Sequence, residues 1–310
     1  RDLHKEYRRQ RQMCIRDRGE TMEISEKAPA KLNLSLDTPF RHQDGEPEWR
    51  MVMTAIDLSD YVHIKTIPNS KEITVQTNTG FLPCDQRNLA YQAAKLLQSK
   101  LDKPEGVEIE IDKHIPVSAG MGGGSADAAA VLRGLNKIWN LNMSREELAK
   151  LALTIDSDVP FCVYSEPALV TGRGEKITPI GPLPPMWLVI AKPQASVSTP
   201  TILRQIHEQH LNHQEVQNVV SAIKQQDFDK MCRHMGNALE PITMKKCPDI
   251  IKIKDKMLQF GADAAQMSGS GPTVFGISQK KSRATHIYNS LRGFCKEVYL
   301  VRALDSLTTK

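Results

Sequence analysis

A glycine-rich stretch in the middle of the chain has the residue types of a phosphate-binding loop. Gly120, Gly122, Gly123 and Gly124 fall between a strand predicted over 107–113 and a helix predicted over 125–138. Glycines let successive backbone N–H groups converge, and a helix start adds unpaired N–H groups and the positive end of its dipole. The stretch therefore predicts a site for a polyanion, best matched by the phosphates of a nucleotide.

A turn that only bends the chain is the commoner role of paired glycines, but four glycines directly before an Ala-rich helix make it the weaker interpretation. The stretch lacks the Gly-Lys-Ser/Thr ending of a P-loop, and its glycines are too crowded for the dinucleotide fingerprint. We expect the nucleotide to be bound by Pro116, Val117, Ser118, Ala119, Gly120, Met121, Gly122, Gly123, Gly124, Ser125 and Ala126.

A second group of polar residues lies near the beginning of the chain. Lys31 and Asn33 are two positions apart in an apolar segment, so on a strand both side chains emerge on the same face. Burying a lysine beside an asparagine without a partner is costly. Either both face solvent on an edge strand, or Lys31 contacts a reacting group and Asn33 hydrogen-bonds a substrate.

Two further motifs are weak when taken alone. Asp156 and Asp158 precede Pro160. A carboxylate can accept the proton of an attacking hydroxyl, but an isolated Asp-x-Asp-x-Pro more often caps a turn. The turn from Gly269 through Ser270 to Gly271 is likewise common in proteins of many kinds.

In this order and spacing, the four motifs resemble those of the GHMP kinases (galactokinase, homoserine, mevalonate and phosphomevalonate kinases). The form Pro-x-x-Ala-Gly-Met-Gly-Gly-Gly-Ser-x-Asp-Ala-Ala is similar to that of the 4-diphosphocytidyl-2-C-methyl-D-erythritol kinase family within them. The resemblance covers nearly everything from Met22 onward. It implies ATP and Mg²⁺, a small-molecule acceptor, and an α+β fold with a ribosomal-S5-like N-terminal and a ferredoxin-like C-terminal domain.

The resemblance also implies residue roles. Lys31 would hold the acceptor hydroxyl or the developing phosphoryl charge, and Asp158, not Asp156, would be the catalytic carboxylate. Asn88 would flank the adenine pocket. The C-terminal glycine motif would pack against the nucleotide loop and help to enclose the phosphates; its residues are Gly269, Ser270 and Gly271. The protein ligands of the metal are not indicated.

The chain departs from the family where the cytosine is recognised. The family has an Asp-Gly-Tyr-His segment, whereas residues 44–51 here read Asp-Gly-Glu-Pro-Glu-Trp-Arg-Met. Trp49 could stack on a base, but Arg50 offers only donors where a neutral histidine offers a donor and an acceptor. After Thr199, Leu203 takes the place of a second stacking aromatic. We expect Asn33, Trp49, Arg50, Thr199 and Leu203 to bind the acceptor, with weakened recognition of cytosine.

Composition is that of an ordinary globular enzyme. The 310 residues are 40% hydrophobic and 25% charged, and six scattered cysteines without a Cys-x-x-Cys pair favour a reducing cytoplasm over a zinc site. Much of the +5 net charge lies in residues 1–21, which we interpret as a non-native extension before Met22. A basic arm that binds nucleic acid is the weaker alternative. We expect neither nucleic-acid nor membrane partners.

The predicted elements alternate between strands and helices. Domains are expected over 22–180 and 186–310, joined by a Pro-rich linker. Ser144 and Glu147 form a capping box at the start of one helix. Strands are expected over 61–67, 71–77, 187–191, 273–277 and 297–302, and around a bend at Pro29 within 24–37. Helices are expected over 88–99, 144–154, 200–210, 215–225, 227–235, 249–260 and 282–291.

Three functions remain open from the sequence. The first is phosphorylation of 4-diphosphocytidyl-2-C-methyl-D-erythritol on its 2-hydroxyl, a step of non-mevalonate isoprenoid synthesis. The second is a GHMP-type kinase with another hydroxylated acceptor. The third is a nucleotide-binding regulatory protein without turnover, which the presence of Lys31, Ser125 and Asp158 disfavours. The oligomeric state is not indicated.

Overall fold

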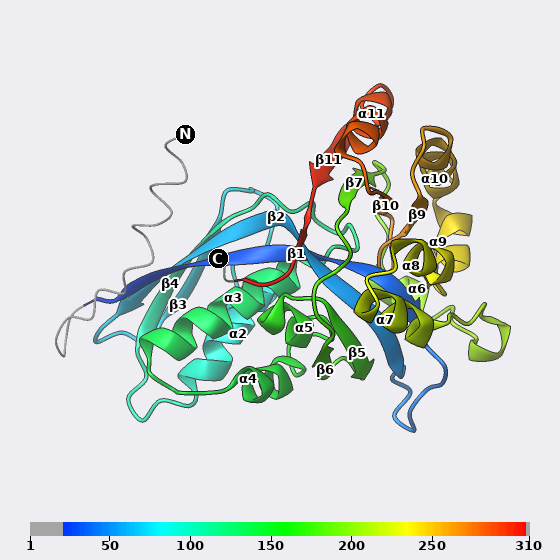
Figure 1. Cartoon of the computed structure of the whole chain (residues 1–310). Coiled ribbons are helices and arrows are strands. Elements are labelled where there is room, and N and C mark those ends of the chain that lie inside the picture. The colour runs from blue at the N-terminus through cyan, green and yellow to red at the C-terminus, as the bar shows by residue number, and fades with distance from the viewer. Residues whose placement is uncertain (1–20, 308–310) are drawn as a thin grey trace. The chain divides into compact units, whose positions relative to one another are not determined.

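The computed structural model describes residues 21–307 (Figure 1), and so nearly all of the expected extension lies outside the described residues. The chain divides into two compact units. Unit 1 comprises 21–29, Ser59–Ile115 and Gly123–Val163, and unit 2 comprises Ala30–Leu58, Pro116–Gly122 and 164–307. Each unit draws on several stretches of sequence, so the units do not coincide with the expected domains 22–180 and 186–310, whose boundary stays a prediction.

Three strands of unit 1 pair in sequence along its sheet, beside the first half of β1 (Glu23–Asp37). The second half of β2 (Trp49–Ile67) pairs antiparallel with β4 (Gly106–Asp112), which pairs in parallel with β3 (Ile73–Thr77). In β4 the apolar residues Val107, Ile109 and Ile111 are buried and the intervening acidic residues are exposed. This alternation with a period of two places one face of the strand against the core.

Two helices of unit 1 pack against each other, α2 (Leu89–Gln98) and α3 (Gly123–Ile138) (Figure 1). Eight consecutive residues of α3, from Ser125 to Leu132, are buried, because small alanine side chains let the backbone approach its neighbours closely. The shorter helix α4 (Arg145–Ala152) begins at the expected capping box of Ser144 and Glu147, and α5 (Val159–Tyr164) follows. The sequence had not predicted α5.

The strand β1 (Glu23–Asp37) is continuous over 15 residues, which corrects the expected bend at Pro29. Proline removes one donor from a strand ladder but has a φ compatible with extended backbone. From residue 28 to residue 38 every side chain of β1 and its end is buried. Burial of this long apolar run outweighs the single missing hydrogen bond.

Unit 2 contains a four-stranded antiparallel sheet in the order β11-β7-β10-β9. Its strands are β7 (Trp187–Lys192), β9 (Ala264–Met267), β10 (Val274–Ser278) and β11 (Glu297–Val301). Helices α10 (Asp249–Gln259) and α11 (Lys281–Leu291) pack against this sheet. The succession β7-α10-β9-β10-α11-β11 is the split β-α-β arrangement of ferredoxin-like domains, as expected.

Further strands of unit 2 pair with the long strands. β5 (Ala168–Gly172) pairs with the first half of β2 and with β6 (Lys176–Pro179). β8 (Gly236–Asn237) runs parallel to the end of β1, and β12 (Ala303–Leu304) pairs with β2. β5, β6, β8 and β12 were not predicted from the sequence.

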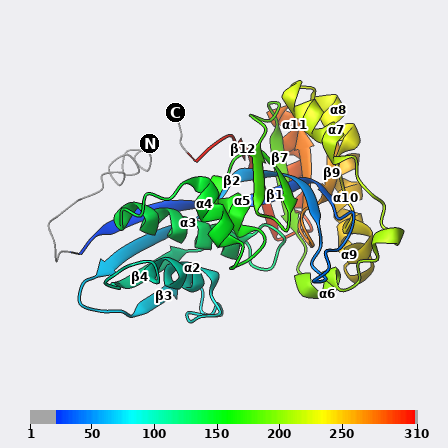
Figure 2. The same cartoon turned by 90° about the horizontal axis from the view of Figure 1, so that it is seen from below.

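Between β7 and α10 the chain forms a group of short helices. Helices α7 (Val216–Lys224) and α8 (Phe228–His234) pack as a pair (Figures 1 and 2), and α9 (Glu240–Lys246) precedes α10. The helix expected over 200–210 is instead the five-residue α6 (Thr199–Leu203) and a 3₁₀ turn, Glu208–His210. Arg41 explains the interruption, because its guanidinium donates to the Leu203 carbonyl and pairs with Glu208.

Among residues 21–307, no helix is both long enough and apolar enough to cross a membrane.

Candidate active site

The glycine loop of unit 2 has no room for side chains at two positions. Gly120 has φ +79°, and a Cβ there would lie 2.5 Å from the Ser268 carbonyl oxygen. Gly122 has φ +64°, and its Cβ would lie 3.0 Å from Cγ of Lys31. Both positions combine a left-handed backbone with close neighbours, so only glycine fits without strain.

The C-terminal glycine motif packs directly against this loop, as expected. Ser268 donates its hydroxyl to the Gly120 carbonyl at 3.1 Å, and the Thr273 N–H donates to the Ala119 carbonyl at 3.2 Å. The Lys31 N–H donates to the Met121 carbonyl at 3.0 Å, which attaches β1 to the same loop. The loop geometry of unit 2 is therefore set by hydrogen bonds from two distant parts of the chain.

Lys31 and Asn33 lie buried on β1, which excludes the alternative that both face solvent. Their exposed fractions are 3% and 0%, and Lys31 Nζ donates to Asn33 Oδ1 at 2.8 Å. A Cβ on Gly269 would lie 3.0 Å from Lys31 Nζ, so the amine lies directly against the glycine motif. An ammonium group buried at a glycine turn is costly to maintain and is typical of a site that meets an anion.

Several side chains that the sequence analysis did not single out hold the glycine motif in place. Asn237 donates to the carbonyls of Met267 and Gly269, at 2.9 and 2.8 Å. Glu240 accepts the Met267 N–H at 2.9 Å, and Gln266 donates to the carbonyls of Asn33 and Leu34. Their partners are far away in sequence, so no local pattern could have identified these residues.

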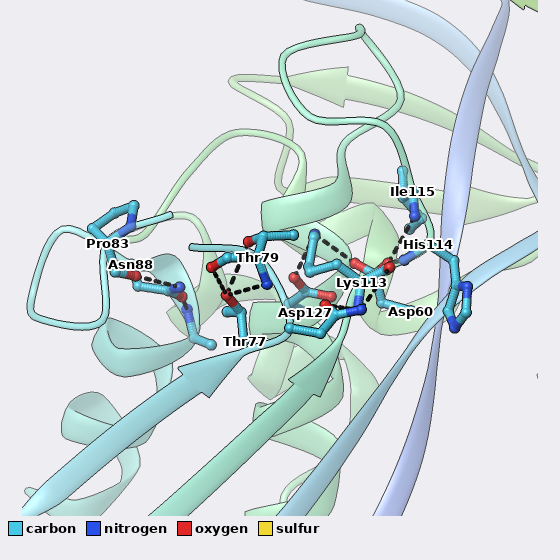
Figure 3. A network of polar contacts seen from close by, with 11 residues as sticks. Asp60, Thr77, Thr79, Pro83, Asn88, Lys113, His114, Ile115 and Asp127 are labelled. Atoms are coloured by element: carbon cyan, nitrogen blue, oxygen red, sulfur yellow. Dashed lines mark hydrogen bonds and ion pairs between the residues drawn. The ribbon is translucent and has the colours of Figure 1, made fainter. Parts of the chain in front are cut away.

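In unit 1, the helix of the phosphate motif begins two residues earlier than expected. Gly123 and Gly124 form the first turn of α3, whose leading N–H groups have no partner within the helix. A Cβ on Gly124 would lie 3.6 Å from the Leu89 side chain, so the starts of α2 and α3 lie together. Asn88 caps α2 by accepting the Ala90 N–H and donates to the Pro83 carbonyl (Figure 3). Ser125 is buried in the first turn.

The two aspartates before α5 have different environments. Asp156 is exposed, and its Oδ1 accepts the Asp158 N–H at 3.1 Å, the geometry of an Asx turn. Asp158 is half-buried, and its carbonyl accepts the Cys162 N–H at the start of α5. The Asp156 side chain therefore has the turn-forming role that the sequence had left open.

The residues expected to contact a cytosine do not form one surface. Trp49 is buried and Arg50 is exposed, because neighbouring residues on β2 point to opposite faces. The expectation that both side chains contact the acceptor stays a prediction. The buried Trp49 shares its face of β2 with Met51, whose sulfur accepts from Asn33 Nδ2 at 3.4 Å. Trp49 thus lies on the same face as the candidate substrate residue Asn33, whereas Arg50 does not.

Helix α6 carries the other two expected substrate residues. Thr199 is exposed, and its hydroxyl lies 2.7 Å from the hydroxyl of Ser270 in the glycine motif. Leu203 is half-buried at the end of the helix, and its carbonyl accepts from Arg41 at 2.9 Å. Arg41 was not singled out from the sequence, although it connects α6 with the segment that replaces the family's cytosine motif.

A histidine hydrogen bond and an ion pair order that segment within unit 2. His42 Nε2 lies 2.8 Å from Glu48, and Arg173 lies 2.8 Å from Asp44. Glu48 also accepts the Gly172 N–H at 3.2 Å. Of these residues, only Asp44 and Glu48 belong to the stretch quoted from the sequence, and neither was expected to have a structural role.

The described residues contain no group of three or more His, Cys, Asp or Glu side chains that could hold a metal ion without other ligands. Phosphate oxygens of a bound nucleotide would supply ligands to Mg²⁺, as in other sites where this ion accompanies ATP. The Ser125 hydroxyl, in the first turn of α3, is an oxygen donor at the same end of the helix. The residues present thus fit a metal that arrives with the nucleotide.

Comparison with known proteins agrees with these motifs. The sequence model for the GHMP kinases N terminal domain matches residues 88–166, and that for the GHMP kinases C terminal domain matches residues 219–297. The 4-diphosphocytidyl-2-C-methyl-D-erythritol kinase of Pediococcus pentosaceus is 63% identical over 91% of this chain and 100% of its own length. The enzyme of the same name from Lactiplantibacillus plantarum is 56% identical over 92% of this chain and 99% of its own.

Solved structures give the same result. A crystal structure of 4-(cytidine 5'-diphospho)-2C-methyl-D-erythritol kinase matches with a TM-score of 0.75 and 30% identity, covering 90% of this chain and 99% of its own. Homoserine kinase from Cytophaga hutchinsonii has the same fold, with a TM-score of 0.76 at 20% identity over 95% of this chain and 98% of its own. The chain therefore belongs to the GHMP kinases and, within them, to the 4-diphosphocytidyl-2-C-methyl-D-erythritol kinase family.

Proposed function

We propose that this protein transfers the γ-phosphoryl group of ATP to the 2-hydroxyl of 4-diphosphocytidyl-2-C-methyl-D-erythritol, a step in non-mevalonate isoprenoid precursor synthesis. The observation that carries the proposal is the buried Lys31 ammonium, held between Asn33 and the Gly269 turn beside the glycine loop. The names of relatives that are 53–63% identical supply the acceptor. The same relatives disfavour a different hydroxylated acceptor and a regulatory protein without turnover.

The phosphates of ATP would be bound by backbone N–H groups of the loop 116–122 and by the first turn of α3. Gly120 and Gly122 keep the loop backbone accessible because their left-handed geometry excludes side chains. The helix contributes leading N–H groups and the positive end of its dipole. Bound Mg²⁺ would neutralise charge on the phosphates; the Ser125 hydroxyl is the residue that we propose to contact it.

The chemistry would depend on two side chains. Lys31 is a fixed positive charge that can stabilise the negative charge developing on the transferred phosphoryl group. Asp158 would accept the proton of the attacking hydroxyl, the role that the resemblance to the family implies for the aspartate of its Asp-Val-Pro segment. Asn33 would hydrogen-bond the acceptor, and Asn88 would flank the adenine.

We propose that the base of the acceptor is recognised by Trp49 and residues of α6, with Thr199 and Leu203 on one face of that helix. Arg50 lies on the opposite face of β2 from Trp49, so its proposed contact is with the charged diphosphate of a ligand rather than the base. We also propose a cytoplasmic location, because the cysteines at 84, 162, 232, 247 and 295 are all free thiols.

A direct assay tests the proposal. ADP release would be measured with 4-diphosphocytidyl-2-C-methyl-D-erythritol, and with mevalonate and homoserine as matched acceptors of the same superfamily. We expect turnover only with the first, abolished by chelating Mg²⁺ and restored by adding it back. ³¹P NMR of the product should show a new phosphomonoester on the 2-oxygen. Turnover of another acceptor, or ATP binding without any transfer, would overturn the assignment.

A further inference from the structure

Three ionisable side chains, one of them on α3, meet inside unit 1 (Figure 3). Lys113 Nζ lies 2.5 Å from Asp60 Oδ2 and 2.8 Å from Asp127 Oδ2. The exposed fractions of the three side chains are 5%, 0% and 5%. We call Asp60, Lys113 and Asp127 the buried cluster. Nothing in the proposed chemistry uses it, although ionic groups are expensive to bury.

The buried cluster is attached to both ends of the phosphate motif. Asp60 Oδ1 accepts the backbone N–H groups of His114 and Ile115, at 2.7 and 2.9 Å, immediately before the loop begins. Asp127 lies in α3, one turn after the loop ends. A Cβ on Gly123 would lie 3.2 Å from both Lys113 Nζ and Ile115 Cγ2. The first residue of the helix therefore packs against Lys113 of the cluster.

The charges of the buried cluster balance only if one carboxyl is protonated. Burial raises the pKa of Asp127 well above its ordinary value, and the neighbouring Asp60 raises it further, against the opposing effect of Lys113. Burial would lower the pKa of Lys113, but Asp127 and Asp60 raise it overall, so the amine carries its charge. Asp60 accepts three hydrogen bonds, the pattern of an ionised carboxylate, whereas Asp127 Oδ1 has no partner among the described residues.

We propose that the buried cluster is a positioning device for the phosphate loop, in which Lys113 is charged and Asp127, not Asp60, is the carboxyl that carries a proton. Asp60 accepts the backbone N–H groups of His114 and Ile115, just before the loop. Lys113 Nζ lies against Gly123 and donates to both carboxyl groups, of which Asp127 belongs to α3. The proposal rests on the proposed function only in taking the motif 116–126 as the ATP site. Asp60, Lys113 and Asp127 are positioning residues and not catalytic ones.

The neighbouring charged groups leave this proton arrangement undisturbed. At the end of β4, Asp112 Oδ2 lies 2.9 Å from His114 Nε2, and the two side chains are 57% and 50% exposed. Tyr61, next to Asp60 on β2, contacts the His114 ring. Solvent screens these groups strongly compared with the buried cluster.

Isosteric substitutions test the position of the proton. Asp127→Asn imitates a protonated carboxyl, since its oxygen can accept from Lys113 and its amide can donate to Asp60. Asp60→Asn must place an NH₂ group against either the two backbone N–H groups or Lys113. We expect ATP affinity, measured by calorimetry without acceptor, to change less than about twofold in Asp127→Asn and to fall about tenfold or more in Asp60→Asn.

Lys113→Met is the second variant, because it keeps both backbone hydrogen bonds of Asp60 and is interpretable even if Asp60→Asn does not fold. Its ATP affinity should fall about tenfold, with amide hydrogen exchange accelerated at residues 116–124. The KM for ATP should rise while kcat at saturating ATP stays within about threefold, and Lys113→Arg should restore part of the affinity.

Arg133→Met is the matched control. Arg133 is also buried on α3 and charged, but it contacts Glu26 at 3.5 Å and the carbonyls of Lys27 and Cys162, away from the loop. It should lower the unfolding temperature without changing ATP affinity or exchange at 116–124. Equal effects of Asp127→Asn and Asp60→Asn, or unchanged loop exchange in Lys113→Met, would overturn the proposal. The measurements of ATP affinity and of amide exchange need no acceptor, so a failure to phosphorylate the proposed substrate would leave their interpretation intact.

Discussion

Lys31 Nζ donates to Asn33 Oδ1 at 2.8 Å from the same face of β1, with Gly269 covering the amine. The pair is buried although neither side chain is apolar. A charge held this way is preorganised, because no side chain has to move to stabilise a developing anion. In the proposed function, this contact would hold the amine in place for the transfer.

Replacing Lys31 tests that charge. Lys31→Met keeps the length of the side chain and should lower kcat by about 10²- to 10³-fold. Lys31→Arg should not rescue activity, because Gly269 leaves no room for a planar guanidinium beside Asn33. Single-turnover rates at saturating ATP and acceptor measure the effect. A Met variant with near-wild-type turnover would show that Lys31 is only structural.

The two aspartates before α5 should respond differently. Asp158→Asn should retain ATP binding and lose about 10²- to 10⁴-fold in kcat, as expected for a general base. Asp156→Asn should be mild, since an asparagine oxygen can still accept the Asp158 N–H. Steady-state kinetics of the two variants provide the comparison. Equal losses would mean that the carboxylates have been assigned wrongly.

Gly120 should not tolerate a methyl group. In Gly120→Ala the new Cβ would meet the Ser268 carbonyl oxygen at 2.5 Å in a left-handed backbone, so unfolding should become easier by about 1–3 kcal/mol and ATP should bind more weakly. Gly80→Ala is the control, because nothing lies within 4 Å of its Cβ and its φ is not left-handed. Urea unfolding and calorimetry measure both effects; matching results from the two variants would contradict the loop geometry.

Recognition of the base of the acceptor should depend on Trp49 and not on its neighbour Arg50 on β2. Trp49→Ala should raise the KM for the acceptor by about tenfold or more, because the loss of a stacked base costs ~1–3 kcal/mol. Trp49→Phe keeps an aromatic ring and should retain most of the affinity. Arg50→Ala should leave recognition of the base unchanged, because its side chain points to the other face. Comparing acceptors with cytosine and uracil separates the base from the diphosphate. A larger effect of Arg50 on base preference would reverse this assignment.

His213 should make stability depend weakly on pH. A hydrogen bond to Asp37 raises the pKa of His213, although burial opposes the shift. The stabilisation from this raised pKa is complete below the unfolded value of about 6.5 and is lost as pH rises through the folded value. Because the side chain is 45% exposed, the effect should not exceed about 0.5 kcal/mol.

Urea unfolding at pH 5.5, 7 and 8.5 would compare wild type with His213→Gln. The free energy of unfolding of the wild type should exceed that of the variant by an amount that shrinks as the pH rises. An advantage that grows with pH would show that the neutral imidazole is the stabilising form.

Local patterns predicted those parts of the fold whose partners are close in sequence. The capping box of Ser144 and Glu147, the alternation in β4 and the turn between β4 and α3 are all local, and the structure has each of them. Pro29 and the interrupted helix at 200–210 were mispredicted because burial of β1 and the contacts of Arg41 override local preference.

The same distinction applies to the site. The glycine motifs and the pair Lys31 and Asn33 could be recognised because each is a short stretch of sequence that matches a family motif. Asn237, Gln266 and Asp60 have partners that are distant in the chain, and isolated polar residues of this kind carry no signal without the fold. The sequence analysis named Trp49 and Arg50 together, and the structure adds that Trp49 is buried and Arg50 exposed, as expected for neighbours on a strand.

The order of strands in the four-stranded sheet has a consequence for synthesis on the ribosome. β7 forms the centre of the sheet with Ala191 opposite Val274 and Val298, so both of its neighbours are translated long after it. Until they emerge, a strand whose residues from Leu188 to Lys192 are buried in the finished protein has two open edges. Pairings of such long range slow folding, and open apolar edges attract other chains. We expect a chain shortened before β11 to aggregate rather than to remain a smaller folded enzyme.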